Sequence, residues 1–297
     1  MTEITIRSYG KVNLSLDLCG VRDDGYHILE SVMQKISLHD FVNVKWTSLP
    51  QEEIQINLTC NKTFLPTDER NLAYRGAKLM ADTFGEQVGG GIIDIHIEKH
   101  LPVAAGLAGG SGNGSALLVA LNRLWDLKQD TKALCQLGAQ LGADVPFCLL
   151  IQNTKYGCAL CEGTGTELTP LKSRFKKAVL LVKPSFGVST KEVYQGIDDC
   201  IIENRPNTPE LIEAMKNRDD AVIYENMVNV LEEYTLKQYK EVQQIKDKIA
   251  AETTAEKVLM TGSGPTVFAL FEKLSEAQKA CKQMRKEGYE AYWATTY

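Results

Sequence analysis

LPVAAGLAGGSGNGSALL, residues 101–118, holds five glycines within nine positions and lies between two segments of different periodicity. Before it, residues 91–99 read GIIDIHIEK, where isoleucines alternate with polar residues as they do in a half-buried strand. After it, alanines and leucines recur at helical spacing, at Ala116, Leu117, Ala120, Leu121, Leu124 and Leu127. The sequence therefore predicts a strand, a glycine-rich loop and a helix in succession.

The glycine-rich loop is a candidate phosphate site. Glycines let the backbone approach an anion without Cβ atoms in the way, and the first amides of the helix, from about Asn113, lack partners within the helix. Two common phosphate motifs are not matched. Gly10-Lys11 is followed by Val12 rather than Ser or Thr, and Ser115 stands where a dinucleotide fingerprint has its third glycine. A flexible turn without a ligand is the alternative.

The composition favours a partner that is a small molecule. The chain has 297 residues, which is enough for two domains or for one large domain with a real core. Its net charge of −5 argues against a nucleic-acid partner, which would need a broad basic face. We see neither a signal peptide nor an apolar run of membrane length, so we expect a cytoplasmic protein that has no membrane partner.

Eight cysteines are scattered through apolar stretches of the chain. Cys158 and Cys161 form a lone CxxC inside a predicted strand, without a second pair or a histidine at metal-binding spacing. Reduced core thiols are therefore favoured over a zinc site. That usage suits a reducing cytosol.

Periodicity divides the chain into two halves, with a boundary near residue 171. The first half is predicted to hold, besides the segment around the glycine loop, a strand or hairpin at 4–18, strands at 28–38, 41–46 and 54–59, and helices at about 71–84 and 131–141. The Asp24-Gly25 pair predicts a turn before residue 28. The second half is predicted to hold strands at 178–184, 257–260, 266–271 and 289–294, and helices at about 190–196, 209–217, 237–251 and 275–287.

Further polar features lie outside the glycine loop. Lys11 and Asn13 share the polar face of the first strand. Asp144 stands alone among apolar residues, where a carboxylate must be paired, hydrogen-bonded or functional because burying it alone is costly. Residues 261–265, TGSGP, are either a ligand loop or a plain turn. Lys11 could equally be solvated, and Asp144 could only cap a helix or form an ion pair.

Short motifs distributed along the chain carry a family resemblance. They are GKVNL at 10–14, DGYH at 24–27, ESVMQ at 30–34, IEK at 97–99, PVAAGL at 102–107, GADVPF at 142–147 and GSGPT at 262–266. Together they resemble the GHMP superfamily of small-molecule kinases over nearly the whole chain. The glycine loop alone indicates only the superfamily. The GYH, Lys-x-Asn and ADVPF elements indicate those members whose substrate carries a cytidine diphosphate.

The resemblance implies an α/β fold of two domains. An N-terminal domain of the ribosomal-protein S5 domain 2 type would cover residues 1–171, a C-terminal α/β domain would cover residues 172–297, and the active site would lie in the cleft between them. The implied activity is ATP-dependent phosphorylation of a small-molecule alcohol that has a cytidine diphosphate moiety. Mg²⁺ would bridge the phosphate oxygens, and the expected assembly is a monomer or a weak homodimer.

The resemblance also implies roles for particular residues. By position, Asp144 would be the catalytic base and Lys11 its cationic partner. The ATP-binding residues would be Asn71, on the adenine side, and the loop residues Pro102, Val103, Ala104, Ala105, Gly106, Leu107, Ala108, Gly109, Gly110, Ser111, Gly112 and Asn113. The substrate-binding residues would be Asn13, Tyr26, His27, Thr190 and Tyr194. Within that set, Tyr26 and Tyr194 would sandwich the cytosine.

The loop departs from the usual family pattern GLGGGSS. Ala108 replaces a glycine and Gly112 replaces the second serine, and the loss of a hydroxyl near the phosphates could weaken phosphate or magnesium binding.

Two rival functions remain open. One is another GHMP kinase that acts on homoserine or a mevalonate derivative, which the GYH element disfavours because those substrates carry no base to stack upon. The other is a non-catalytic nucleotide- or RNA-binding module on the S5-like fold. The negative net charge and the presence of both Lys11 and Asp144 disfavour that second rival.

Overall fold

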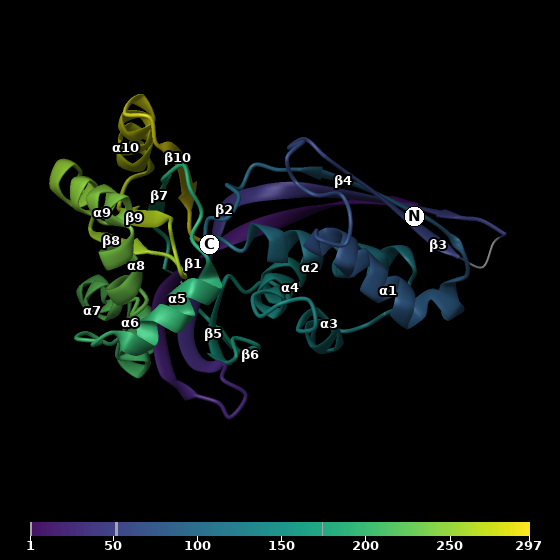
Figure 1. Cartoon of the computed structure of the whole chain (residues 1–297), viewed down its shortest axis with the longest axis horizontal. Coiled ribbons are helices and arrows are strands. Elements are labelled where there is room, and N and C mark those ends of the chain that lie inside the picture. The colour runs from purple at the N-terminus through teal and green to yellow at the C-terminus, as the bar shows by residue number, and fades with distance from the viewer. Residues whose placement is uncertain (1, 51–52, 174) are drawn as a thin grey trace. The chain divides into compact units, whose positions relative to one another are not determined.

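The computed structural model describes residues 2–50, 53–173 and 175–297, and the chain forms two compact units (Figure 1). Unit 1 comprises the described residues of Met1–Gly10, His39–Pro102 and Ala108–Lys155. Unit 2 comprises those of Lys11–Leu38, Val103–Leu107 and Tyr156–Tyr297. The units therefore interleave along the sequence, whereas we predicted contiguous domains, 1–171 and 172–297, which stay a prediction.

Two long strands explain this interleaving. β1 spans Glu3–Val21 and β2 spans His27–Ser48, so each begins in one unit and ends in the other. They pair with each other across the predicted Asp-Gly turn, in which Gly25 has a φ of 82°. The strands predicted separately at 28–38 and 41–46 are a single strand, because no glycine or proline interrupts the sequence between them.

Unit 1 is a sheet covered by helices. Its part of β2 pairs antiparallel with β4, and β4 pairs parallel with β3, so that Val44 lies opposite Ile95 and Ile95 opposite Leu58. In Figure 1 the helices α1 and α2 lie along one face of these strands, and their apolar residues share a core with the isoleucines of β4. The elements are β3 (Ile54–Cys60), α1 (Leu72–Val88), β4 (Gly91–Glu98), α2 (Gly109–Leu124), α3 (Thr131–Gly138) and α4 (Val145–Asn153).

The start of α2 corrects a prediction. We expected the helix to begin near Asn113, because glycine has a low helix propensity. It begins at Gly109, so the glycine run forms its first turns. Tertiary packing overrides propensity here: a Cβ placed on Gly114 would lie 3.1 Å from the Leu72 carbonyl oxygen, and one on Gly76 would lie 2.9 Å from the Gly114 carbonyl oxygen. Glycine is what lets α1 and α2 come this close.

Unit 2 contains a second sheet with helices packed on it. Its part of β2 pairs with β5, and β5 pairs with β6. The second sheet has the strand order β10-β7-β9-β8, and apolar residues of α9 and α10 share its core. The strands are β5 (Cys158–Gly163), β6 (Glu167–Leu171), β7 (Ala178–Lys183), β8 (Lys257–Met260), β9 (Val267–Phe271) and β10 (Glu290–Thr295). The helices are α5 (Thr190–Gly196), η1 (Ile197–Asp199), α6 (Thr208–Asn217), α7 (Asp220–Asn226), α8 (Glu232–Gln238), α9 (Lys240–Glu252) and α10 (Leu274–Lys286).

The remaining elements agree with the predicted pattern, with five exceptions. Periodicity did not predict α4, η1, α7, α8 or β6, which are short. Among the described ranges, none of the helices combines the length and the apolar character that crossing a bilayer requires. The cysteines are free thiols, and Cys158 and Cys161 are both buried within β5.

Candidate active site

Lys11 lies in a buried polar network on β1. Alternation along the strand places Val12 and Leu14 on one face and Lys11 and Asn13 on the other, and all four are buried. Lys11 Nζ donates a hydrogen bond to Asn13 Oδ1 at 2.8 Å, although only 3% of Lys11 is exposed. A buried ammonium needs such an oxygen. The alternative, that Lys11 is a solvated lysine, therefore does not agree with the structure.

The N-terminal part of the predicted ATP loop is a compact turn of unit 2. The amide of Lys11 donates to the Leu107 carbonyl oxygen at 3.1 Å, which fixes the turn against β1. Two of its positions have left-handed backbone, with φ values of 51° at Ala104 and 68° at Gly106. Ala108, the N-cap residue of α2 in unit 1, has a φ of 56°. Alanine rarely adopts this conformation, so the surrounding structure holds the turn in a strained shape, as is common where a backbone contacts a ligand.

The TGSGP segment packs against that turn. A Cβ placed on Gly106 would lie 2.5 Å from the Thr261 carbonyl oxygen, so only glycine permits this approach. Gly262 and Gly264 have φ values of 58° and 84°, and Asn229 Nδ2 donates to the Gly262 carbonyl oxygen at 2.8 Å. The two glycine turns and the Lys11 network are therefore one constellation within unit 2.

The rest of the predicted ATP loop is the N-terminus of α2 in unit 1. Its residues from Gly109 onward contribute first-turn amides, which lack partners within the helix and suit an anion. Gly110 is exposed, and a Cβ there would meet only the Leu72 side chain at 3.5 Å. Ser111 is half-buried in this first turn, and Pro102 is buried. An exposed glycine beside first-turn amides can accept a phosphate.

The Asn113 side chain is part of a buried polar network in unit 1. Its side chain is buried and donates to Ser8 Oγ at 3.0 Å and to Asp40 Oδ2 at 2.9 Å, while its oxygen accepts from Lys99 Nζ at 3.1 Å. Lys99 and Asp40 form a buried ion pair, and Asp40 also accepts the amide of Leu101 at 2.8 Å. The Asn113 side chain thus braces the start of α2, and a direct contact with ATP stays a prediction.

Asn71 and Asp144 both stand at the N-termini of helices in unit 1. Asn71 caps α1: its side chain accepts from the Ala73 amide at 2.9 Å and donates to the Pro66 carbonyl oxygen at 2.8 Å. Asp144 occupies the N-cap position of α4 and is half-buried, but its carboxylate makes no capping hydrogen bond to the α4 backbone, all of which the structure describes. A simple helix cap therefore does not explain Asp144.

The predicted substrate residues cluster in part. His27 Nε2 lies 2.7 Å from Asp198 Oδ1, and the His27 ring is 5.4 Å from the ring of Tyr194. Thr190 lies near the TGSGP turn, with its hydroxyl 3.0 Å from that of Ser263. Tyr26 is 68% exposed at the hairpin turn, free to contact a ligand. The Tyr26–Tyr194 sandwich on cytosine stays a prediction.

Helix α5, which begins with Thr190 and contains Tyr194, is anchored by Glu192. The Glu192 carboxylate accepts a hydrogen bond from the Tyr239 hydroxyl at 2.8 Å. This bond, with some desolvation, raises the pKa of Tyr239 to about 12, because the bonded carboxylate favours the neutral phenol. The anchor fixes the helix that presents two of the predicted substrate residues.

Sequence reasoning missed four polar residues of these networks. They are Ser31, Asp40, Asp198 and the hydroxyl of Thr261. Ser31 lies within one of the resemblance motifs and Thr261 within the TGSGP segment, so both had a signal. For Asp40 and Asp198 the sequence offers none, because their partners are distant along the chain.

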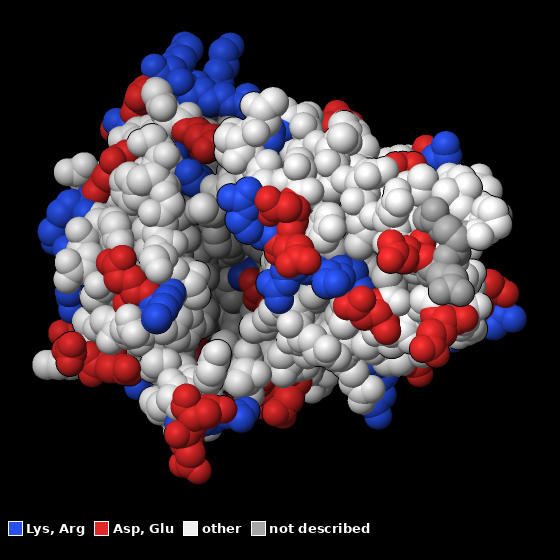
Figure 2. Space-filling model, turned by 45° about the vertical axis from the view of Figure 1, so that its right-hand side comes forward, with Lys and Arg blue, Asp and Glu red and all other residues white. Residues whose placement is uncertain are grey.

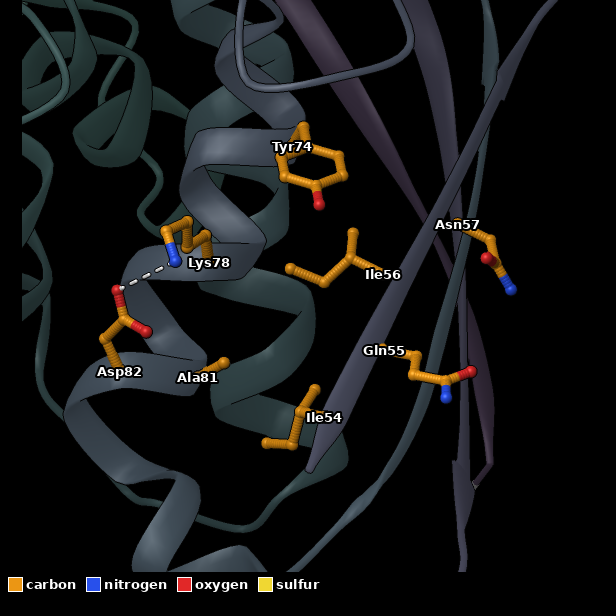
Figure 3. A pocket seen from close by; sticks show the side chains of 8 residues that line it. All are labelled: Ile54, Gln55, Ile56, Asn57, Tyr74, Lys78, Ala81 and Asp82. Carbon is orange, nitrogen blue, oxygen red and sulfur yellow. Dashed lines mark ion pairs between the residues drawn. The ribbon is translucent and has the colours of Figure 1, made fainter. Parts of the chain in front are cut away.

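A separate concavity in unit 1 is not part of the predicted site. It has a volume of about 420 Å³ and lies between the edge strand β3 and helix α1. Figure 3 shows Ile54, Ile56 and Tyr74 turned toward this gap, with the Lys78–Asp82 ion pair on the helix beside it. None of the residues that line it was predicted to bind ATP or substrate.

The described chain has neither a one-sided charge distribution on the face shown in Figure 2 nor a cluster of metal-binding side chains. On the face shown in Figure 2, acidic and basic side chains are interspersed. In residues 2–50, 53–173 and 175–297 there is no group of three or more His, Cys, Asp or Glu that could hold a metal ion by themselves. A magnesium ion here would have to take most of its ligands from phosphates and water, as it usually does with nucleotides.

The chain belongs to the GHMP kinases. The family described as GHMP kinases N terminal domain matches residues 71–151, and GHMP kinases C terminal matches residues 211–290. The predicted family and the α/β fold are thereby confirmed.

Comparison with individual members of this family gives more specific similarities. The chain is 43% identical over 289 residues to the 4-diphosphocytidyl-2-C-methyl-D-erythritol kinase of Clostridium novyi (strain NT), covering 97% of this chain and 98% of the relative. A crystal structure of 4-(cytidine 5'-diphospho)-2C-methyl-D-erythritol kinase matches with a TM-score of 0.79 and 30% identity, covering 99% of each chain. Homoserine kinase from Cytophaga hutchinsonii matches with a TM-score of 0.75 and 18% identity, covering 100% of this chain and 95% of that one, which shows a shared fold only.

Proposed function

We propose that this protein phosphorylates the 2-hydroxyl of 4-diphosphocytidyl-2-C-methyl-D-erythritol with ATP, a step in non-mevalonate isoprenoid precursor biosynthesis. The observation that carries the proposal is the 43% identity to the Clostridium novyi kinase over nearly the full length of both chains. The polar network around Lys11 supports it, because a buried cation beside two glycine turns suits phosphoryl transfer.

ATP is the proposed phosphate donor, and the residues present fit its phosphates. The turn Val103–Leu107 and the first turn of α2 offer backbone amides, and Gly110 in that first turn is exposed and has no side chain. Lys11 supplies positive charge that would offset charge on the transferred group. When bound, Mg²⁺ would neutralise phosphate charge.

Asp144 is the proposed general base. An in-line attack by the substrate alcohol needs a carboxylate that accepts the proton as the new P–O bond forms. Asp144 is half-buried and is not engaged in capping α4, which supports this role.

We propose that the cytidine diphosphate end of the substrate contacts five residues: Asn13, Tyr26, His27, Thr190 and Tyr194. Exposure of Tyr26 and the contact between His27 and Tyr194 support an aromatic site for a base. The His27–Asp198 hydrogen bond fixes the orientation of the imidazole ring. The cytoplasmic location and the oligomeric state expected from sequence stay predictions.

An ATP-consumption assay with three substrate classes tests the proposal. Turnover with the diphosphocytidyl substrate, and little with homoserine or mevalonate derivatives, is the expected result. Preference for either of the latter would assign the protein to another GHMP activity. ATP binding without turnover of any of them would favour a binding module.

Asp144→Asn tests the assigned chemistry. Turnover per folded molecule should fall on the order of a hundredfold or more, the usual scale of general base catalysis, while ATP and substrate still bind. Near-normal turnover with a lowered melting temperature would instead make Asp144 a structural residue.

Tyr26→Ala tests the base site. It should raise the Michaelis constant for the diphosphocytidyl substrate by a factor equivalent to about 1 to 3 kcal/mol, the usual range for stacking on a base. ATP binding should change little. Equal losses for ATP and substrate would mean that Tyr26 serves the fold alone.

A further inference from the structure

The orientation of the Asn13 amide follows from Ser31. The Ser15 carbonyl oxygen can only accept, so the Ser31 hydroxyl must donate its single proton to it, at 2.6 Å. The Ser31 oxygen is then left as an acceptor toward Asn13, 2.8 Å away. The group of Asn13 that faces Ser31 must therefore be its NH₂, which turns the amide oxygen toward Lys11.

Thr261 completes this arrangement from the TGSGP turn. Its hydroxyl oxygen accepts a hydrogen bond from the Asn13 backbone amide at 3.1 Å. The same hydroxyl donates to Asn13 Oδ1, with 3.2 Å between the two oxygen atoms. The Gly106 carbonyl oxygen lies 3.4 Å from the same hydroxyl and is a second acceptor for the one proton. The hydroxyl thus connects the Asn13 amide with the turn Val103–Leu107.

The Lys11 ammonium lies where these segments converge. A Cβ placed on Gly262 would be 3.7 Å from Lys11 Nζ and 3.6 Å from the Gly106 carbonyl oxygen. Ser31, Asn13 and Thr261 are each at most 1% exposed, so water does not compete freely for these hydrogen bonds. Side chains on β1, β2 and the TGSGP turn therefore orient the Asn13 oxygen that the ammonium contacts.

We propose that Ser31 and Thr261 are positioning residues that fix the Asn13 amide so that its oxygen holds the Lys11 ammonium beside the phosphate turn. Neither needs to touch ATP or substrate. Without Ser31, the amide can rotate and point its NH₂ at the ammonium, which repels it. The kinetic part of the inference rests on the proposed kinase function, because it assigns Lys11 a role in phosphoryl transfer.

The kinetic test compares Ser31→Ala and Thr261→Val with matched controls. Both variants should lower turnover about tenfold or more, since misplacing a catalytic group by about 1 Å can reduce the rate a hundredfold. The Michaelis constants for ATP and substrate should stay near wild type.

Ser15→Ala is the control for Ser31, because it deletes a buried hydroxyl that bonds only the Val32 amide in the described chain and keeps the backbone carbonyl. Thr266→Val is the control for Thr261, because the Thr266 hydroxyl is buried without a partner among the described residues. Both controls should retain turnover per folded molecule. Equal losses in the controls and the test variants would overturn the inference.

Two further measurements separate positioning from a general structural effect. Thr261→Ser keeps the hydroxyl and should restore most of the turnover that Thr261→Val loses. In a Lys11→Met background, Ser31→Ala should cause almost no additional loss, because residues that act as one unit are strongly non-additive. An undiminished tenfold loss in that background would show that Ser31 does not act through Lys11.

A spectroscopic readout keeps the inference independent of the kinase assay. The ¹⁵N-edited NMR signal of the Lys11 ammonium, assigned with Lys11→Met, should show slow proton exchange in the wild-type protein. Ser31→Ala and Thr261→Val should each speed that exchange, whereas Ser15→Ala should not. An unchanged exchange rate would overturn the placement of Lys11 even in an active kinase. If the wild type phosphorylates none of the three substrates, the proposed function fails, and a selective change in exchange would still support the placement.

Discussion

Glycine serves different purposes in the two compact units. In α2 of unit 1, Gly112 and Gly114 have ordinary helical backbone, and they are needed because neighbouring segments pack against them too closely for a side chain. A Cβ on Gly112 would lie 2.6 Å from Ser8 Oγ. In unit 2, Gly106 and Gly262 have positive φ and are needed for conformation. Gly106 is also close-packed, so it carries both constraints. The same residue type in one motif can therefore fail under mutation for different reasons.

Gly106→Ala should have the largest effect on stability. The left-handed conformation costs a non-glycine residue about 1 to 2 kcal/mol, and overpacking adds about 1 to 3 kcal/mol, so we expect a loss of about 2 to 5 kcal/mol. Gly25→Ala is the control, because Gly25 has a φ of 82° and no atom within 4 Å of its Cβ position. Denaturant unfolding should show a loss of only about 1 to 2 kcal/mol there. Equal losses would mean that the close approach to Thr261 is unimportant.

Gly112→Ala should have an intermediate effect that depends on Ser8. Overpacking against Ser8 Oγ should cost about 1 to 3 kcal/mol. In a Ser8→Ala background the same change should cost less than half as much, because the clashing oxygen is gone. A double-mutant cycle measured by thermal unfolding gives the coupling. Simple additivity would show that the clash is relieved elsewhere.

Gly110→Ala should separate stability from binding. The site is exposed and helical, so alanine should stabilise the protein by up to about 1 kcal/mol. The added methyl group would nevertheless crowd an anion held by the first-turn amides, and ATP affinity in titration calorimetry should fall. Unchanged ATP affinity for both Gly110→Ala and the larger Gly110→Val would remove this turn from the nucleotide site.

Two lysines, Lys99 buried in unit 1 and Lys35 half-buried in unit 2, extend the comparison and give the smallest expected effect. Lys99 of unit 1 is neutralised by Asp40, whereas burial lowers the pKa of Lys35 in unit 2 to about 8 from its usual 10.5. Between pH 8 and 10.5 the unfolded chain therefore binds more protons at this site than the folded chain does, so its contribution to stability rises with pH. Any stability advantage of Lys35→Met should shrink across that window. A constant difference from pH 7 to 11 would contradict the lowered pKa.

Local sequence patterns predicted most elements of the fold. The Ile alternation of β4 and the Asp24-Gly25 turn were sufficient signals, because each depends only on neighbouring residues. The start of α2 was predicted wrongly, because what stabilises a helix of glycines is the approach of α1, a tertiary contact. Helix α4 was missed because it is short and its residues 145–151 are all buried, so no alternation of apolar and polar residues marks it as a helix.

The candidate site was predictable only in part. Lys11 and Asn13 share a strand face, and simple alternation predicted that pair. Ser31 and Thr261 reach Asn13 through strand register and through a turn far along the chain, which periodicity does not encode. The same holds for Asp198, whose bond to His27 spans 171 positions. Pairings of this kind need the folded chain.

The interleaving of the units has a consequence for biosynthesis. The β1–β2 hairpin of Lys11–Leu38 is made early, but the residues that cover Leu16 and Leu18 in its core come from unit 2 segments made much later. At about 5 to 20 residues per second, the ribosome needs on the order of ten seconds to reach Tyr156 from Leu38. During that delay unit 1 can fold around its own core, whereas the apolar face of the hairpin stays exposed to solvent. We expect ribosome-bound chains in which Lys155 has just emerged from the ribosome to resist proteolysis in unit 1 and to be cut within the hairpin.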